Sequence, residues 1–181
     1  MKIIFGLGNP EPEYSWTRHN VGKDVLNILV EMFGSSWEHD SKFDCDILKS
    51  SDFILVKPHS FMNEIGSVVA GFANYYKCGL DDVLVCYDEL DLVIGAFKLG
   101  KGKGSNIHNG LLSVEEQLGS KDFWHLRVGV RDEFIPMSVQ KAGKDPSKYV
   151  LAKFNISHRN KISKLVKETI AKELTAWLSK K

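Results

Sequence analysis

The stretch Val83-Leu84-Val85-Cys86-Tyr87, with Asp88 directly after it, indicates the fold of this 181-residue chain more clearly than any other. A continuous apolar run of this length is typical of a strand that is covered on both faces. Such strands belong mainly to sheets with helices packed on either side. The run therefore predicts an α/β protein, and it places the Asp88 carboxylate at the carboxyl end of a buried strand.

Helical and strand patterns alternate on both sides of this run. Apolar residues at helical spacing predict helices at residues 20–33, 61–77, 109–118 and 156–178, the last with Ser157 as its N-cap. Further strands are predicted at residues 2–8, 94–99 and 123–131, and residues 43–57 have the pattern of a β-hairpin. The polar stretch 132–147 is predicted to be a mobile loop. Together these elements predict a single three-layer domain over residues 1–181, with a twisted mixed β-sheet flanked by helices.

The composition argues against several broad classes of protein. With 43% hydrophobic and 26% charged residues, the chain has an ordinary globular composition. No apolar run is long enough to cross a bilayer, and the apolar start of the chain is too short for a secretion signal. The three cysteines are odd in number and lack C-x-x-C spacing, which argues against a disulfide framework or a zinc site. We therefore expect a cytoplasmic protein without membrane contacts.

The net charge of +1 conceals an uneven distribution of charge. Residues 1–90 contain 7 Lys/Arg and 14 Asp/Glu, whereas residues 91–181 contain 17 Lys/Arg and 9 Asp/Glu. This polarity suits a protein that presents one basic face to a polyanion. Lysines that only keep the surface soluble, especially on the last helix, would give the same counts. Charge alone leaves both interpretations open.

The first predicted strand ends in Gly6-Leu7-Gly8-Asn9-Pro10, which has several interpretations. A dinucleotide-binding turn requires a third glycine where this chain has Glu11, whose charge would oppose a pyrophosphate. A second interpretation is that the strand delivers Asn9 to its carboxyl end, where ligands bind in open α/β sheets. A third is an asparagine that merely suits a tight turn.

His19, in Thr17-Arg18-His19-Asn20, precedes the first predicted helix and is a candidate general base. Imidazole has a reference pKa of about 6.5, close to working pH. A base of this kind needs a partner that fixes its tautomer and stabilises the imidazolium, and Asp88 is well placed for that task. The alternatives are an ordinary surface histidine and simple acidity of the turn Asp88-Glu89-Leu90-Asp91.

Motifs for other hydrolytic chemistry do not occur in the sequence. There is no G-x-S-x-G elbow for an acyl-enzyme, and no H-E-x-x-H or H-x-x-x-H spacing for a metal. Cys86 lies in the middle of the buried run, where we expect its thiol to be inert. If the chain is a hydrolase, its nucleophile is most simply a water molecule activated by His19.

Two more asparagines and a basic loop complete the candidate residues. Asn63 and Asn109 stand at the starts of predicted helices, where they are either helix caps or amides that read a peptide main chain and hold an oxyanion. The glycine-lysine loop at residues 100–105 is either a solvated hairpin loop or a docking site for phosphates. The basic residues in and near it are Lys98, Lys101, Lys103 and Arg127.

Seven segments, which run from residue 3 to about residue 131, form a recognisable series. They are Gly6-Leu7-Gly8-Asn9-Pro10 with Tyr14, Thr17-Arg18-His19-Asn20-Val21-Gly22, Lys57-Pro58-His59-Ser60-Phe61-Met62-Asn63, Asp88-Glu89-Leu90-Asp91-Leu92, Lys98-Leu99-Gly100, His108-Asn109-Gly110-Leu111 and Leu126-Arg127-Val128-Gly129. In this order, they resemble the bacterial peptidyl-tRNA hydrolases. The resemblance implies a monomeric α/β enzyme without metal or organic cofactor. It also implies hydrolysis of the ester between a peptide and the 3′ ribose of tRNA, which recycles tRNA from prematurely released peptidyl-tRNA.

The resemblance implies a role for each matching residue. His19 corresponds to the general base, Asp88 to the carboxylate that orients it, and Asn9 to the amide that positions substrate and steadies the oxyanion. The residues expected to contact the peptide and the acceptor end of the tRNA are Tyr14, Phe61, Asn63, His108 and Asn109. Those expected to receive tRNA phosphates are Lys98, Lys101, Lys103 and Arg127.

Three departures from the family pattern bear on this assignment. Asn106 and Ile107 stand where the family usually has glycines, and Ile avoids positive φ, so we expect the loop before His108 to differ in conformation. Glu11 replaces a glycine and is expected to add negative charge near the cleft. The loop at residues 132–147 is longer than the pattern leads us to expect.

Two other functions are weighed against hydrolysis. The family includes plant organellar splicing factors that share the fold and do not cleave, so a non-catalytic RNA-binding relative is the main alternative. Such a binder need not keep the complete set His19, Asp88, Asn9 and Asn63. A dinucleotide-dependent enzyme would retain nucleotide on purification.

Overall fold

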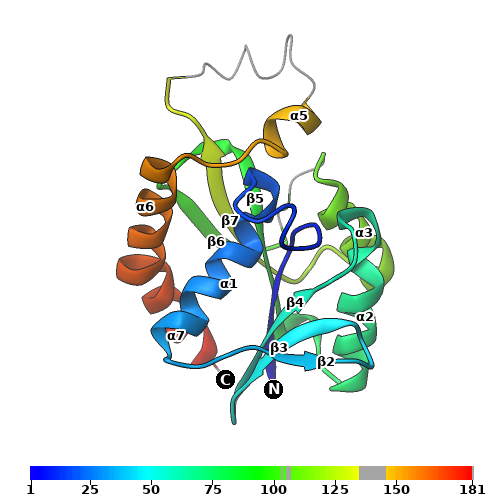
Figure 1. Ribbon diagram of the computed structural model, residues 1–181. Coiled ribbons are helices and arrows are strands. Elements are labelled where there is room, and N and C mark those ends of the chain that lie inside the picture. Colours follow the sequence, from blue (N-terminus) through cyan, green and yellow to red (C-terminus); the bar gives the residue numbers. More distant parts are fainter. Residues whose placement is uncertain (103, 105–106, 135–145, 181) are drawn as a thin grey trace.

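In the computed structural model, the described residues are 1–102, 104, 107–134 and 146–180. Within them, seven strands form one sheet with helices on both faces (Figure 1). The strands are β1 (Lys2–Gly6), β2 (Glu38–Asp40), β3 (Cys45–Lys49), β4 (Phe53–Pro58), β5 (Val83–Val93), β6 (Phe97–Lys101) and β7 (Trp124–Arg131). The helices are α1 (Val21–Met32), α2 (Ile65–Tyr75), α3 (Asn109–Leu118), α5 (Pro146–Val150), α6 (Ile156–Leu165) and α7 (Ala171–Leu178). Short 3₁₀ turns are η1 (Arg18–Asn20), η2 (Met62–Glu64) and η3 (Leu80–Asp82), and the π-helical turn η4 (Val166–Ile170) joins α6 to α7.

The sheet is mixed, as predicted. Its strand order is β2-β3-β4-β1-β5-β7-β6. The four central strands β4, β1, β5 and β7 run parallel, whereas β2, β3 and β6 pair antiparallel towards the edges. The apolar run that begins at Val83 lies in β5, between two parallel neighbours. Its continuous hydrophobicity follows from this central position.

Two apolar cores lie on the two faces of the sheet. Successive residues of a strand point to opposite faces, so Leu84 and Cys86 belong to one core and Val83, Val85 and Tyr87 to the other. The first core includes α1 and the C-terminal helices, and the second includes α2 and α3. Figure 1 shows these two helical layers on either side of the sheet. The predicted three-layer α/β architecture is confirmed.

Some strand boundaries differ from the prediction. β5 continues past Asp88 to Val93, because β7 pairs with it well beyond the point where its pairing with β1 ends. The strand predicted at residues 94–99 begins only at Phe97, after a turn. The three-residue strand β2 has no recognisable pattern in the sequence and forms by pairing with β3.

The C-terminal part also differs in detail. The closing helix consists of α6, η4 and α7, but its N-cap is Asn155 and not Ser157, since the Asn155 side chain accepts a hydrogen bond from the backbone N–H of His158. Of the predicted loop, residues 135–145 lie outside the described residues, and residues 146 and 147 begin α5. None of the helices in the described ranges has the length and apolar character needed to span a membrane.

Gly22, in the first turn of α1, allows this helix to touch the sheet. A Cβ atom at this position would collide with the carbonyl oxygen of Cys86 and lie 2.7 Å from the backbone nitrogen and oxygen of Leu7. The helix backbone therefore rests on Leu7, directly after β1, and on Cys86 within β5. Because η1 immediately precedes α1, this contact also fixes His19 relative to Asp88.

We expect Gly22→Ala to lower the free energy of unfolding by about 1–3 kcal/mol, the usual cost of forcing extra atoms into a packed site. Chemical denaturation measures this change. Gly79→Ala is the matched control and should change stability little, because no atom lies within 4 Å of a Cβ built there. Equal stabilities of the two variants would show that the fold does not depend on the close approach at Gly22.

Candidate active site

A cleft of about 460 Å³ lies where β1 ends and β5 continues beyond it. This is the region of an open α/β sheet in which ligands bind. Its polar lining includes Asn9, His19, Asn63, Asp88, His108 and Asn109. Its apolar wall includes Met62, Leu90, Val150 and Leu151. Sequence reasoning selected the six polar residues but missed Val150 and Leu151, because it treated the preceding residues as loop and α5 is only five residues long.

Asp88 holds two imidazoles. Its Oδ1 atom lies 2.8 Å from Nδ1 of His19 and 2.7 Å from Nε2 of His108. The centroids of the two rings are 4.7 Å apart. The carboxylate is almost fully buried, at 3% exposure. The structure therefore brings together the predicted pair of His19 and Asp88, and it adds His108 as a second partner that sequence reasoning did not connect with Asp88.

The directions of the hydrogen bonds assign the protons on both rings. An ionised carboxylate can only accept, so Nδ1 of His19 carries a proton. Nε2 of His19, which no described residue contacts by a hydrogen bond, then has a free lone pair in the neutral ring. In His108, Nδ1 caps α3 by accepting from the backbone N–H of Leu111 at 3.1 Å, so its proton lies on Nε2. His108 uses both ring nitrogens within the protein, whereas His19 keeps one for a ligand.

The charges of this cluster shift the pKa values of its members. Burial alone disfavours the His19 imidazolium, but the charge of Asp88 and its hydrogen bond outweigh burial and raise the pKa of His19. Burial likewise disfavours ionised Asp88, yet the two imidazoles hold the pKa of Asp88 below its usual value. The carboxylate is therefore ionised throughout the neutral range, which the proton assignment requires.

The Asn9 side chain has a fixed orientation. The backbone N–H of Met62 donates to Oδ1 of Asn9 at 3.0 Å. Because a backbone N–H can only donate, the other atom of the amide, Nδ2, is the donor that Asn9 leaves for a ligand. A donor held in this way at a cleft suits a carbonyl oxygen that gains negative charge during a reaction.

Two residues that sequence reasoning did not single out hold the Asn9 backbone. Asn20, which is fully buried, accepts from the Asn9 N–H at 2.9 Å and donates to the Asn9 carbonyl at 3.0 Å. Lys23 is 1% exposed and donates from Nζ to the same carbonyl at 2.8 Å. Burial lowers the pKa of Lys23 to about 8, against the opposing effect of the Glu11 carboxylate. The segment from His19 to Lys23 thus carries the imidazole and also holds the Asn9 backbone.

Asn63 and Asn109 are both exposed at the cleft, on η2 and at the start of α3. Neither residue caps a helix. Phe61 and Glu64 precede η2 and α2 without a side-chain cap, and His108 caps α3. The interpretation of the two asparagines as helix caps is therefore wrong.

Tyr14 and Phe61 are not among the residues that line the cleft. Phe61 is 52% exposed, directly before η2. Tyr14 is half-buried, and its backbone carbonyl accepts a hydrogen bond from the Thr17 hydroxyl. Their expected contacts with tRNA stay predictions.

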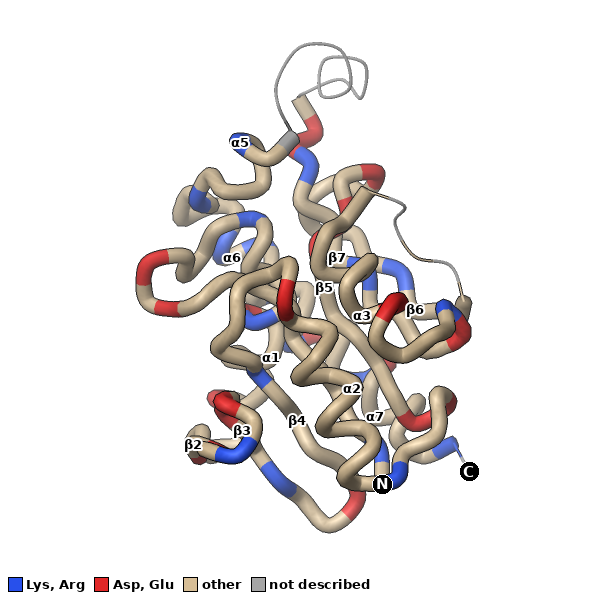
Figure 2. The backbone as a smooth tube through the Cα atoms, turned by 90° about the vertical axis from the view of Figure 1, so that its right-hand side faces the viewer, with Lys and Arg blue, Asp and Glu red and all other residues tan. Residues whose placement is uncertain are grey.

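A second cleft of about 370 Å³ gathers basic residues on β6 and β7. Lys98 and Arg127 are opposite each other in the pairing of these strands, and Lys101 also lines the cleft. Arg127 is already paired, since its Nε and Nη2 donate to Oε2 of Glu89 at 2.8 and 2.6 Å. The Nζ atom of Lys101 lies 2.6 Å from Oδ1 of Asp81. Figure 2 shows basic and acidic segments intermingled in this part of the molecule.

Lys98 differs from its basic neighbours. It is exposed, and it forms no ion pair with any residue in the described parts of the chain. Among the described residues that are predicted to dock phosphates, Lys98 is therefore the one whose charge is not already held by a carboxylate of the protein. Lys103 lies outside the described residues.

The structure describes two of the three residues that depart from the family pattern, Glu11 and Ile107. Glu11 does not line the cleft, because its carboxylate lies 2.8 Å from Nζ of Lys57, so the expected negative charge near the cleft is offset. Ile107 lines the cleft and is 69% exposed. Asn106 lies outside the described residues.

Two clusters in the described residues have ligand atoms close enough to share a metal ion. One is His19 with Asp88 and His108, where hydrogen bonds already account for the atoms that meet at Asp88. The other is His39 with Asp46 and His59, outside the cleft.

Comparison with known proteins places the chain in a family. The family model described as peptidyl-tRNA hydrolase matches residues 3–181. A peptidyl-tRNA hydrolase of Coxiella burnetii (strain RSA 331 / Henzerling II) is 42% identical over 130 residues, which cover 72% of this chain and 70% of the relative. One from Rhodococcus opacus (strain B4) is 37% identical over 171 residues, which cover 92% of this chain and 86% of the relative.

Solved structures agree with this result. The crystal structure of peptidyl-tRNA hydrolase from Acinetobacter baumannii matches this chain with a TM-score of 0.73 at 27% identity, over 100% of this chain and 96% of that one. A point mutant of the enzyme from that organism gives a TM-score of 0.74 at 28% identity, with the same coverage. Since the family model spans nearly the whole sequence and the relatives share both sequence and architecture with it, the chain belongs to the peptidyl-tRNA hydrolase family.

Proposed function

We propose that this protein hydrolyses the ester between a peptide, or an N-blocked aminoacyl group, and the 3′ ribose of tRNA, with a water molecule activated by His19 and Asp88. Membership of the peptidyl-tRNA hydrolase family supports the reaction. The observation that carries the finer assignment is the 2.8 Å contact between His19 and Asp88 in a cleft that leaves Nε2 of His19 open. The reaction would return tRNA from prematurely released peptides to translation.

The first step is attack by water on the ester carbonyl. Nε2 of His19 takes a proton from the water as its oxygen bonds to the carbonyl carbon. Asp88 stabilises the imidazolium that forms. The Nδ2 group of Asn9 donates to the carbonyl oxygen as this becomes negative. When the intermediate collapses, the bond to the ribose oxygen breaks, and His19 returns the proton to that oxygen.

His108 moderates the effect of Asp88 on His19. Both imidazoles donate to the same carboxylate oxygen, so the charge of Asp88 is shared between two donors. Hydrogen bonds to a carboxylate stabilise its charge and weaken its pull on any further proton. This sharing limits the rise in the pKa of His19, and a general base must be neutral for part of its population at working pH.

The amides of Asn63 and Asn109 are the groups that would recognise the peptide. Both are exposed at the cleft, and each can donate and accept. A blocked α-amine offers them an amide N–H and a carbonyl, whereas a free α-amine is a charged group without that carbonyl. The apolar wall formed by Leu90, Val150 and Leu151 can cover a side chain of the peptide.

His19→Ala should lower kcat by about 10²–10⁴-fold, because a positioned base contributes this much. The affinity for tRNA should stay at the wild-type level, since His19 is expected to act only on the water. Single-turnover release of N-acetyl-aminoacyl groups from tRNA measures the first quantity, and filter binding of tRNA measures the second. Release by the variant at close to the wild-type rate would show that His19 is not the general base. A wild-type protein that releases no product would favour the non-catalytic RNA-binding alternative.

The pH profile of kcat/KM should have an acid limb set by His19. The base must be neutral, and Asp88 raises the pKa of His19, so the rate should fall as pH drops through that raised value. Asp88→Asn removes the charge that raises the pKa. Its acid limb should therefore move to lower pH while the plateau falls, because the imidazolium loses its partner. An acid limb at the wild-type position in Asp88→Asn would show that Asp88 does not control His19.

Lys98→Glu should raise KM for full-length peptidyl-tRNA and make binding less dependent on salt, because one phosphate contact is lost. Cleavage of a minimal ester fragment without the tRNA body should be nearly unchanged. Lys164→Glu, at an exposed position on α6, makes the same change in net charge and is the matched control. An equal rise in KM for both variants would point to a general effect of charge and not to docking at β6.

A further inference from the structure

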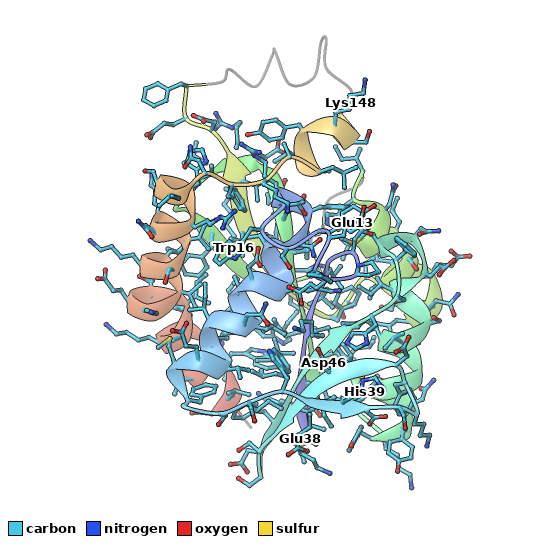
Figure 3. All side chains as sticks on the ribbon, viewed as in Figure 1. Glu13, Trp16, Glu38, His39, Asp46 and Lys148 are labelled. Atoms are coloured by element: carbon cyan, nitrogen blue, oxygen red, sulfur yellow. The ribbon has the colours of Figure 1, made fainter. Side chains whose placement is uncertain are left out.

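A second group of histidines and acidic residues lies away from the cleft, on the edge of the sheet formed by β2, β3 and β4. His39 on β2 pairs directly with Asp46 on β3, and His59 follows the end of β4. Nδ1 of His39 lies 3.7 Å and Nε2 of His59 lies 3.0 Å from Oδ1 of Asp46. The two rings stack, with centroids 5.3 Å apart and planes 11° apart. Figure 3 shows the labelled side chains of His39 and Asp46 close together on the β2–β3 hairpin.

The spacing of these atoms fits a small metal ion. Bonds of about 2.0–2.2 Å from a tetrahedral zinc ion to nitrogen and oxygen place neighbouring ligand atoms about 3.3 Å apart. The two distances to Asp46 lie on either side of this value, and all three ligand atoms lie within 4.8 Å of one another. His39 is half exposed, so its ring can adjust by the few tenths of an ångström that a bond requires.

Each of two ligands is oriented by an outer partner. Nδ1 of His59 lies 3.2 Å from Oδ1 of Asp44, and Nε2 lies 3.0 Å from Oδ1 of Asp46. When a metal ion displaces the proton that Nε2 shares with Asp46, the N–H at Nδ1 still donates to Asp44 and Nε2 can bind the ion. A carboxylate behind the histidine is the usual outer contact of a metal-binding imidazole. Lys57 lies 3.4 Å from the other oxygen of Asp46, Oδ2, and leaves Oδ1 on the side of the histidines. The backbone N–H of His59 also donates to the Asp44 carbonyl at 3.0 Å.

The charge around the group favours a cation. Residues 38–46 contain Glu38, Asp40, Asp44 and Asp46 against Lys42, and Lys57 adds one positive charge beside Asp46, so the surroundings remain acidic. Imidazole nitrogen with one carboxylate oxygen is a ligand set that suits zinc, whereas magnesium prefers oxygen ligands and keeps its water. The sequence offered no sign of this site, because its three residues do not have the short local spacing of zinc motifs.

From this geometry we propose that His39, Asp46 and His59 form a surface site for a divalent transition-metal ion, with zinc as the best-fitting member. Asp44 orients His59 from behind, and water completes the coordination. The bound ion joins β2, β3 and the segment after β4, and so it tightens the edge of the sheet. The site is separate from the proposed hydrolytic reaction and does not depend on it.

Calorimetric titration of zinc chloride into EDTA-treated wild-type protein is the test. We expect one binding site that is retained in His19→Ala, which disables the other histidine cluster. Asp44→Asn removes an outer partner and should weaken zinc binding by about 10–100-fold. His39→Asn removes a ligand and should weaken zinc binding at least as much. Zinc should raise the thermal midpoint of the wild-type protein and of His19→Ala, but not that of His39→Asn.

Controls separate this site from other sources of binding. His39→Asn should keep the wild-type rate of peptidyl-tRNA hydrolysis. A wild-type protein without hydrolase activity would therefore not contradict the zinc site, and a protein that does not bind zinc would not contradict the hydrolase function. Zinc binding that is lost in His19→Ala and kept in His39→Asn would overturn the proposal, as would an absence of binding to the wild-type protein. Equal heats from magnesium chloride would also overturn it, because they would indicate only attraction to acidic residues.

Discussion

The buried carboxylate of Asp88 is the constraint on which the site depends. A charge that is 3% exposed is costly unless hydrogen bonds compensate it. His19 and His108 supply these bonds, and they precede helices on opposite faces of the sheet. Asp88 lies on β5, between those helical layers, and it therefore meets one imidazole from each of them. The three-layer architecture is what allows a single carboxylate oxygen to hold both rings.

Close packing between α1 and the sheet fixes the positions of the residues at the cleft. At Gly22 the backbone of α1 rests on Leu7, directly after β1, and on Cys86 within β5. The neighbouring residues Asn20 and Lys23 reach the Asn9 carbonyl. One short segment thus carries the His19 imidazole and holds the Asn9 backbone. A buried lysine with a lowered pKa is tolerated here because it has a carbonyl acceptor and the opposing charge of Glu11.

The two edges of the sheet carry different chemistry. The strand order places β2 and β3, from the acidic first half of the chain, at one edge and β6 at the other. His39 and Asp46 lie on the acidic edge, and Lys98 and Arg127 lie on the basic one. The uneven charge of the two halves is therefore reflected at the two edges of the sheet. Part of the basic edge is neutralised within the protein, since Glu89 binds Arg127.

The sequence by itself determined the longer helices and most strands, but not the five-residue α5. It also pointed to His19, Asp88 and Asn9, because hydrophobic periodicity and strand-end residues are local signals. Only the tertiary structure decided that His108 shares Asp88, that Arg127 is held by Glu89, and that His39 and His59 meet at Asp46. Helical periodicity also leaves Lys23 off the apolar stripe, although the folded chain buries it under the segment that contains Asn9. The physical reason is the same in each case: these contacts join residues from different elements, and a pattern along one element carries no information about which side chain will face it.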